Sequence, residues 1–192
     1  MKKLIAMVAA VAALAGCAVM PETAPAGAFQ TESDFSVTLP SDWSRWPSQI
    51  NPATSGEYLT KDGMLLNRLH FVTIADGQSF VRVFREADVP TYADGASEFE
   101  VVEMVTRSLA LIGYNSVEAV EIRPATIDGN EGIRFGLIGN WENGLNVRGD
   151  VAAVAQEDGL HLILFLAPEM HYYASLADEV DQIMNSMDLA AE

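Results

Sequence analysis

The sequence LHLILFLA occupies residues 160–167 and is apolar at every position except His161. Successive side chains of a strand point to opposite faces of the sheet, so this segment presents apolar groups on both faces. Strands of this kind lie inside a sheet that is covered on both sides. Residues 160–167 therefore predict a central strand with further structure packed against each of its faces.

Turn-forming pairs divide the chain before this strand into short segments. Asp128-Gly129, Asn143-Gly144 and Asp158-Gly159 follow one another between residues 116 and 168. Such pairs join neighbouring antiparallel strands in hairpins. This region therefore predicts a meander of antiparallel strands that leads into the central strand.

The pairing of the two strands around Asn143 follows from their apolar patterns. A two-residue loop at 143–144 would set the apolar face of one strand against the polar face of the other. A three-residue loop at 142–144 removes this conflict, because a shift of one residue turns every side chain to the opposite face. The longer loop pairs Trp141 with Leu145, Leu137 with Gly149 and Phe135 with Val151. It also brings Arg134, Ile138 and Asn140 near Ala152, Arg148 and Asn146 on the other face.

Two amphipathic helices are expected beside these strands. Residues 97–112 begin with Ser97 and Glu100, which match a capping box, and Gly113 follows where the helix would end. The segment after Pro168 carries an apolar stripe at helical spacing, formed by Tyr173, Leu176, Val180, Ile183, Met184 and Met187. The expected fold class is α+β: a mostly antiparallel sheet with a helix on each face, or α-β-α sandwich.

The start of the domain completes a recognisable order of elements. Residues 35–40 alternate between apolar and polar, and Leu39-Pro40-Ser41-Asp42-Trp43 ends this strand with a proline and a tryptophan. A middle helix, the meander and a last strand that runs into a helix follow. From residue 35 to 189 this order resembles the PsbP-like fold, which PsbP extrinsic proteins of photosystem II share with a Ran-binding nuclear transport factor. The resemblance implies a protein that binds or stabilises other proteins and is not an enzyme; it transfers no functional residue.

The amino terminus indicates export and lipid attachment. Lys2 and Lys3 precede an apolar stretch that ends in Leu14-Ala15-Gly16-Cys17. A basic start and a short apolar core are typical of a secretory signal, and the stretch is too short to span a bilayer. LAGC resembles the bacterial lipobox, which implies cleavage between Gly16 and Cys17 and diacylglycerol on the Cys17 sulfur. The alternative is an ordinary signal peptide that happens to contain a cysteine.

Lipidation would set both the location and the organisation of the mature chain. Each buried acyl methylene contributes about 0.8 kcal/mol, so several chains hold a protein firmly at a membrane. Ala18 follows the cysteine, and in a Gram-negative host the resemblance favours the periplasmic side of the outer membrane. We expect a signal peptide at residues 1–16, a flexible tether at residues 17–34 that reaches at most roughly 50 Å, and one globular domain at residues 35–189.

Charge and cysteine content exclude several functions. After removal of the signal, nine basic side chains face 27 acidic ones, a formal charge of −18. Such a surface repels nucleic acid, so no nucleic-acid partner is expected. It can attract cationic partners, or it can simply keep the protein soluble. Cys17 is the only cysteine, which leaves the mature domain without a disulfide or a catalytic thiol.

No catalytic residue, cofactor or metal site is predicted. His70, His161 and His171 lie in three separate elements, and none is spaced from another as metal ligands are. Asp128-Gly129-Asn130-Glu131 resembles the start of a calcium loop, but the glutamate of the twelfth position is missing. The sequence also lacks nucleotide-binding glycine motifs and the serine elbow of hydrolases.

Two groups of residues remain as candidate binding sites. Arg134, Arg148, Asn140 and Asn146 share a sheet face in the register above and could form an anion or carboxylate site. Their alternative role is pairing with some of the many acids. The region of Trp43 and Trp46 and the segment at 170–173 are the places where exposed aromatic surface is expected.

Two functions from different classes are compatible with these features. The first is a membrane-anchored envelope lipoprotein that binds a protein partner without catalysis. The second is a small envelope enzyme or ligand carrier whose site joins a histidine to carboxylates in space. A deep pocket lined by such a pair would favour the second, and exposed apolar surface would favour the first. The oligomeric state cannot be predicted.

Overall fold

A computed structural model describes residues 20–46, 53–83 and 88–189 of the chain. The predicted signal peptide, the cleavage site between Gly16 and Cys17, and the lipidated Cys17 lie outside these residues. In the described part, no helix is both long and apolar enough to cross a membrane.

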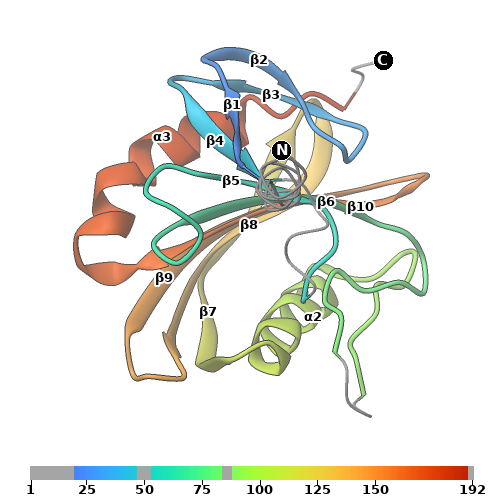
Figure 1. The fold of residues 1–192 in the computed structure, drawn as a ribbon. Helices are drawn as coiled ribbons and strands as arrows, with labels where there is room; N and C mark the ends of the chain where they lie inside the picture. The colour runs from blue at the N-terminus through green and yellow to red at the C-terminus, as the bar shows by residue number, and fades with distance from the viewer. Residues whose placement is uncertain (1–19, 47–52, 84–87, 190–192) are drawn as a thin grey trace, which may run out of the picture.

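Eight antiparallel strands form the main sheet, in the order β1-β4-β5-β6-β10-β9-β8-β7 (Figure 1). A second sheet pairs β2 with β3. The strand bounds are Glu22–Ala24 (β1), Gly27–Gln30 (β2), Ser36–Leu39 (β3), Trp43–Trp46 (β4), Glu57–Thr60 (β5), Arg68–Ile74 (β6), Tyr114–Ile127 (β7), Asn130–Trp141 (β8), Asn146–Gln156 (β9) and Gly159–Pro168 (β10).

β10 is the interior strand that the sequence predicts. It lies between β6 and β9, and all ten of its residues are buried. Its apolar side chains alternate between two hydrophobic clusters. Leu160, Leu162 and Leu164 belong to one cluster, and Ile163, Phe165 and Ala167 belong to the other. The stretch that is apolar on both faces thus supplies both cores of the domain.

The predicted register around Asn143 is confirmed. Leu137 lies opposite Gly149, and Phe135 lies opposite Val151. The loop contains three residues, with the Trp141 amide donating to the Leu145 carbonyl and Gly144 at a φ of 84°. A residue with a side chain rarely adopts this backbone conformation, so Gly144 makes the three-residue loop accessible.

The described residues form the α-helices α2 (Glu98–Leu111) and α3 (Ala174–Asn185). The predicted capping box of α2 is present, since the Ser97 side chain accepts from the Glu100 amide and the Glu100 side chain accepts from the Ser97 amide. α2 packs into the cluster with Leu160, Leu162 and Leu164, whereas α3 packs into the cluster with Ile163, Phe165 and Ala167. A short irregular helical turn, η2 (Glu169–Tyr173), connects β10 to α3.

The predicted tether at residues 17–34 is wrong over most of its described length. Residues of β1 pair with β4 at the edge of the main sheet, and β2 pairs with β3. Ala24 and Phe29 are buried in the hydrophobic cluster that contains Ile163, Phe165 and α3, which we call the α3 cluster. The composition of this segment is poor in bulky apolar residues, but strand hydrogen bonds and two well-placed apolar side chains are enough to hold it on the domain.

Candidate functional site

Arg134 is buried under α3 and is not part of an open site. Its side chain donates to Asp181 Oδ1 at 2.7 Å and to Asn185 Oδ1 at 2.9 Å, and the residue is 7% exposed. Both partners lie on α3, so the guanidinium ties this helix to β8. Arg134 lies on the sheet face that the register predicts. Of its two proposed roles, the structure shows pairing with an acid and not an open anion site.

Arg148, Asn140 and Asn146 come together at the other end of the same face. Asn140 donates to Asn146 Oδ1 at 2.7 Å, and the Arg148 guanidinium lies 5.1 Å from the centre of the Tyr173 ring. They line an open hollow of about 320 Å³ that also contains Glu118 and Glu169. Two carboxylates beside a single arginine do not favour an anion, so this group is a weak anion site.

Trp43 is 2% exposed, which makes the expectation of exposed aromatic surface wrong at this residue. Its indole nitrogen donates to Glu179 Oε1 at 2.9 Å, and the Lys61 ammonium lies 4.9 Å from its ring centre. Trp46 is half-buried. In the segment at 170–173, Met170 is 84% exposed, while Tyr172 and Tyr173 pack against the α3 cluster.

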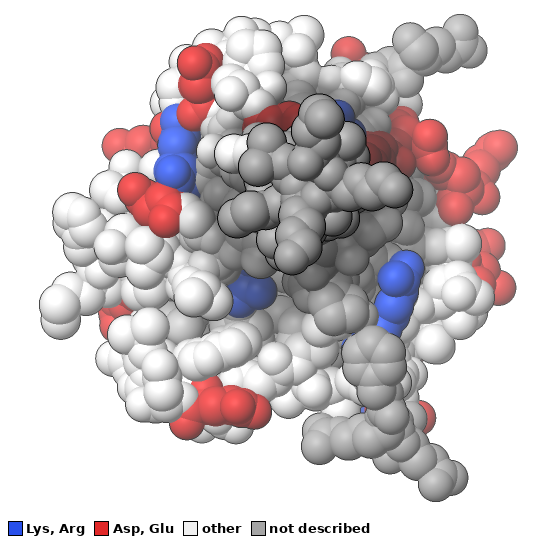
Figure 2. Space-filling model, in the orientation of Figure 1, with Lys and Arg blue, Asp and Glu red and all other residues white. Residues whose placement is uncertain are grey.

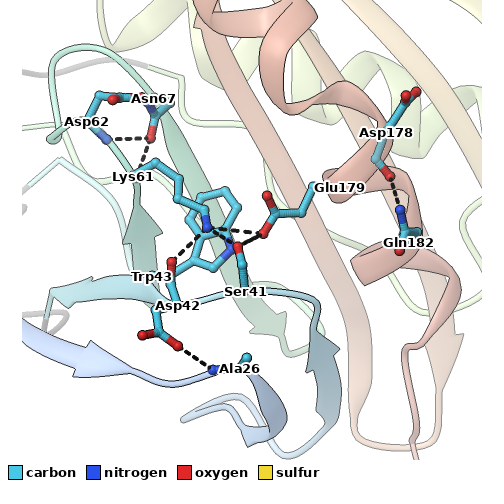
Figure 3. Close-up of polar contacts among 10 residues, drawn as sticks. All are labelled: Ala26, Ser41, Asp42, Trp43, Lys61, Asp62, Asn67, Asp178, Glu179 and Gln182. Atoms are coloured by element: carbon cyan, nitrogen blue, oxygen red, sulfur yellow. Dashed lines mark hydrogen bonds and ion pairs between the residues drawn. The ribbon is translucent and has the colours of Figure 1, made fainter.

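Glu179 accepts three side-chain donors, from the turn before β4, from β4 itself and from the residue after β5 (Figure 3). Ser41 donates at 2.5 Å and the Lys61 ammonium lies at 3.2 Å, in addition to the bond from Trp43. Lys61 also donates to the Ser41 hydroxyl and, at 2.7 Å, to the Asp42 carbonyl. Burial acts to raise the pKa of Glu179, but these donors outweigh it and the pKa lies below its ordinary value. The contacts therefore fasten α3 to the start of β4.

We expect Glu179→Ala to lower the free energy of unfolding by about 2 kcal/mol, because it leaves the buried Trp43 N–H unpaired and removes charge-assisted hydrogen bonds. Asp178→Ala is the matched control: it removes the same charge from the neighbouring exposed position of α3 and should change stability by less than about 0.5 kcal/mol. Urea unfolding monitored by circular dichroism measures both. Equal effects of the two substitutions would rule out the fastening role.

One histidine does meet a carboxylate and a hydroxyl. His161 Nε2 lies 3.0 Å from Asp158 Oδ1, and Nδ1 lies 2.8 Å from Thr73 Oγ1. The Thr73 hydroxyl donates its single hydrogen to the Ser33 carbonyl at 2.5 Å, so that hydrogen is not directed at the ring. A shallow cavity of about 270 Å³ is lined by Thr73 but by neither His161 nor Asp158. This arrangement links strands and offers no activated nucleophile.

The remaining histidines and acids form no metal centre in the described residues. No group of three or more His, Cys, Asp or Glu side chains there is placed to hold an ion. Acidic side chains are spread over the visible face, and few Lys or Arg side chains lie among them (Figure 2). The acidity is thus dispersed and marks no single acidic pocket on this face.

An open and largely apolar hollow lies where the β5–β6 loop meets the ends of β8 and β10. We call it the Leu65 groove. It has a volume of about 230 Å³ and is lined by Met64, Leu65, Leu66, Asn67, Arg68, Tyr114, Trp141, Asn143, Leu145, Val147, Leu166, Ala167 and Pro168. Leu65 is 89% exposed and Leu145 is 43% exposed, so two large aliphatic side chains reach solvent at its rim.

Aromatic residues and one arginine form the polar part of this groove. The Tyr114 and Trp141 rings meet edge to face with centres 4.6 Å apart. Arg68 donates to the Tyr114 hydroxyl at 2.7 Å, and its guanidinium carbon lies 5.7 Å from the Trp141 ring centre. The lining residues come from β6, β7, β8, β9 and β10 and from the β5–β6 and β8–β9 loops.

The Leu65 groove is not predicted by the sequence. Its one local signal is Met64-Leu65-Leu66, three apolar residues directly after the Asp62-Gly63 turn, which resembles the start of a strand. β6 begins only at Arg68, so these residues form a loop and all three side chains stay partly or fully exposed. An apolar run placed in a loop is the feature that would have pointed to the groove.

Comparisons with known proteins support the fold and not a family. No family model matches the sequence, and no curated protein matches it. Among solved structures, the PsbP protein of Synechocystis sp. PCC 6803 (CyanoP) is similar over 90% of this chain and 94% of its own, with 10% identity and a TM-score of 0.53. The fold is therefore PsbP-like: a mostly antiparallel sheet with two helices. LpqN of Mycobacterium tuberculosis, described as involved in cell envelope biogenesis, covers 91% of this chain and 86% of its own at 11% identity and a TM-score of 0.35.

Proposed function

We propose that this chain is a non-catalytic binding module of the bacterial cell envelope that recruits a protein partner through the Leu65 groove. The observation that supports it most is the exposure of Leu65 and Leu145 beside an apolar hollow. Exposed apolar patches with polar surroundings mark protein interaction sites, because removing their apolar surface from water stabilises the complex with a partner. The PsbP-like domain would form an α-β-α sandwich that presents this groove.

Lipid on Cys17 is the proposed means of attachment. The LAGC sequence supports cleavage after Gly16 and acylation of Cys17, and Ala18 supports the periplasmic side of the outer membrane in a Gram-negative cell. Two or more acyl chains would hold the module at the membrane surface. The arrangement of His161, Asp158 and Thr73 gives the alternative of an enzyme or ligand carrier no activated group, so the binding function is preferred.

Site-specific photocrosslinking in intact cells tests this function. A photoreactive amino acid replaces Leu65 in one variant and Phe99 in the other, since Phe99 is a similarly exposed apolar residue (75%) outside the groove. We expect one dominant crosslinked protein at Leu65 and no such product at Phe99. Mass spectrometry of the crosslinked peptide identifies the partner.

Cys17→Ser in the Leu65 variant is the control for attachment. It should abolish the crosslink if the partner is met at the membrane. The same products at Leu65 and Phe99, or a broad mixture of abundant envelope proteins at both, would overturn the proposal that the groove recruits a dedicated partner.

A further inference from the structure

Arg68 is the one charged residue among those that line the Leu65 groove. The residue is half-buried, at the first position of β6. A positive charge placed in an apolar hollow costs solvation unless a partner compensates it. The surroundings of Arg68 therefore bear on what the groove binds.

No carboxylate of the described residues lies within 4.0 Å of Arg68, in a protein that is rich in acids. Most other described cations do have such a partner: Arg45, Lys61, Arg107, Arg134 and Arg148. Arg82 and Arg123 do not, but neither lines the groove. The one cation of the groove is thus left available to a ligand carboxylate.

One hydrogen bond and one aromatic ring hold the Arg68 guanidinium in place, and no other side chain of the described residues accepts from its remaining N–H donors. Tyr114 fixes one nitrogen through a 2.7 Å hydrogen bond, and Trp141 lies beside the planar group at 5.7 Å. A guanidinium has five N–H donors in a fixed fork, and a carboxylate accepts two of them at once. Aromatic contacts that orient the fork reduce the entropy lost when such a ligand binds.

We infer that the Leu65 groove binds the carboxyl terminus of a partner protein whose last residue is apolar. The carboxylate pairs with Arg68, and the last side chain lies among Leu65, Trp141 and Leu145. This inference rests on the proposed function and names the part of the partner that the groove receives.

A chain end matches this groove better than an internal acid does. The terminal residue carries its carboxylate and its side chain on the same Cα, so both can enter one small hollow. In an extended internal segment, an acidic residue and its apolar neighbour point to opposite sides. The groove volume of about 230 Å³ also lies below the range of about 300–1,000 Å³ for ligand pockets that enclose drug-sized molecules.

Fluorine NMR on the full chain labelled with 5-fluorotryptophan tests the inference. The chain has three tryptophans, and Trp141→Phe assigns the signal from the groove. The probes are acetyl-leucyl-leucine, its carboxyl-terminal amide, and acetyl-leucyl-glutamyl-leucinamide, which carries an internal acid. We expect the free acid to shift the Trp141 signal in a saturable manner and both amidated peptides to bind at least about tenfold more weakly, as expected for loss of a charge-assisted contact.

Two variants separate the charge from the hydrogen bond to Tyr114. Arg68→Gln should weaken binding of the free acid by about tenfold or more, whereas Tyr114→Phe, which loses the same bond but keeps the guanidinium, should weaken it by less than about threefold. Equal binding of acid and amide, tight binding of the internal acid, unchanged binding to Arg68→Gln, or no shift with any probe would each overturn the inference. A specific crosslink at Leu65 that survives Arg68→Gln would retain the proposed function and reject only the carboxylate.

Discussion

Arg45→Ala is expected to lower the free energy of unfolding by about 3 kcal/mol. Glu57 has a fully buried side chain, and its carboxylate accepts from Arg45 Nε at 2.6 Å and from the Glu32 amide at 2.5 Å. Removing one partner of a buried ion pair leaves the other as an uncompensated charge, which costs about 3–5 kcal/mol in proteins. We take the lower end, because the Glu32 amide would still donate to Glu57 in the variant.

Protonation of Glu57 can relieve part of this cost. Burial already raises the pKa of Glu57 above its ordinary value, although the Glu32 amide and Arg45 act to lower it. Without Arg45 the pKa should rise further, and the carboxyl can then become neutral at mildly acidic pH. The loss of stability caused by Arg45→Ala should therefore be smaller at pH 5 than at pH 8.

Arg107→Ala is the matched control for Arg45→Ala. Arg107 also faces two carboxylates, Asp88 at 3.3 Å and Glu103 at 3.4 Å, but its side chain is 52% exposed. Pairs of this kind contribute a few tenths of a kcal/mol, so stability should change by less than about 0.5 kcal/mol. Urea unfolding of both variants measures the difference, and comparable losses would contradict a special role of the buried pair.

Acidification below the ordinary pKa of histidine is expected to destabilise the domain through His70. Burial is the main cause that lowers the pKa of His70 from 6.5 to about 4, with Arg68 adding to it and hydrogen bonds at Ser55 and Gly56 opposing it. In the unfolded chain the ring takes up a proton near pH 6.5, but in the folded protein it remains neutral down to about pH 4. Stability is therefore lost as pH falls through this window, by about 3 kcal/mol at full effect.

A comparison with His70→Asn isolates this contribution. Burial also raises the pKa of Glu57 and Asp150, and raised carboxyl pKa values act in the opposite direction because folding then favours the protonated form. The quantity to measure is the difference in unfolding free energy between wild type and variant at several pH values from 7.5 to 4. As the pH falls, the unfolding free energy of the wild type should decrease relative to that of His70→Asn. Parallel curves would show that the pKa of His70 is the same in the folded and unfolded states.

Features that depend on neighbouring residues in the sequence were predictable. The apolar stretch of β10 has one physical solution, an interior strand, and the capping box of α2 is built from residues three apart. The three-residue loop at 142–144 is favoured over the two-residue loop at 143–144, because the shorter loop sets apolar side chains against polar ones. These predictions use only periodicity and turn chemistry, which are local.

Features that depend on which element packs on which were not predictable. Arg134 and Arg148 share a sheet face, but only the path of α3 decides that Arg134 meets Asp181 and Arg148 does not. Trp43 is buried because it packs in the cluster with α3, where Glu179, far along the chain, accepts from its indole nitrogen. The Leu65 groove combines residues of five strands and two loops, and no single segment contains enough of it to be recognised.

The strand β1 changes how far the domain can travel from its attachment. A tether that ended at residue 34 would have permitted excursions of roughly 50 Å. Because β1 begins at Glu22, at most five residue steps separate Cys17 from the folded domain, or about 17 Å when fully extended. If Cys17 is acylated as proposed, this short link keeps β1 close to the lipid headgroups and the domain can rotate about it but cannot move far from the membrane.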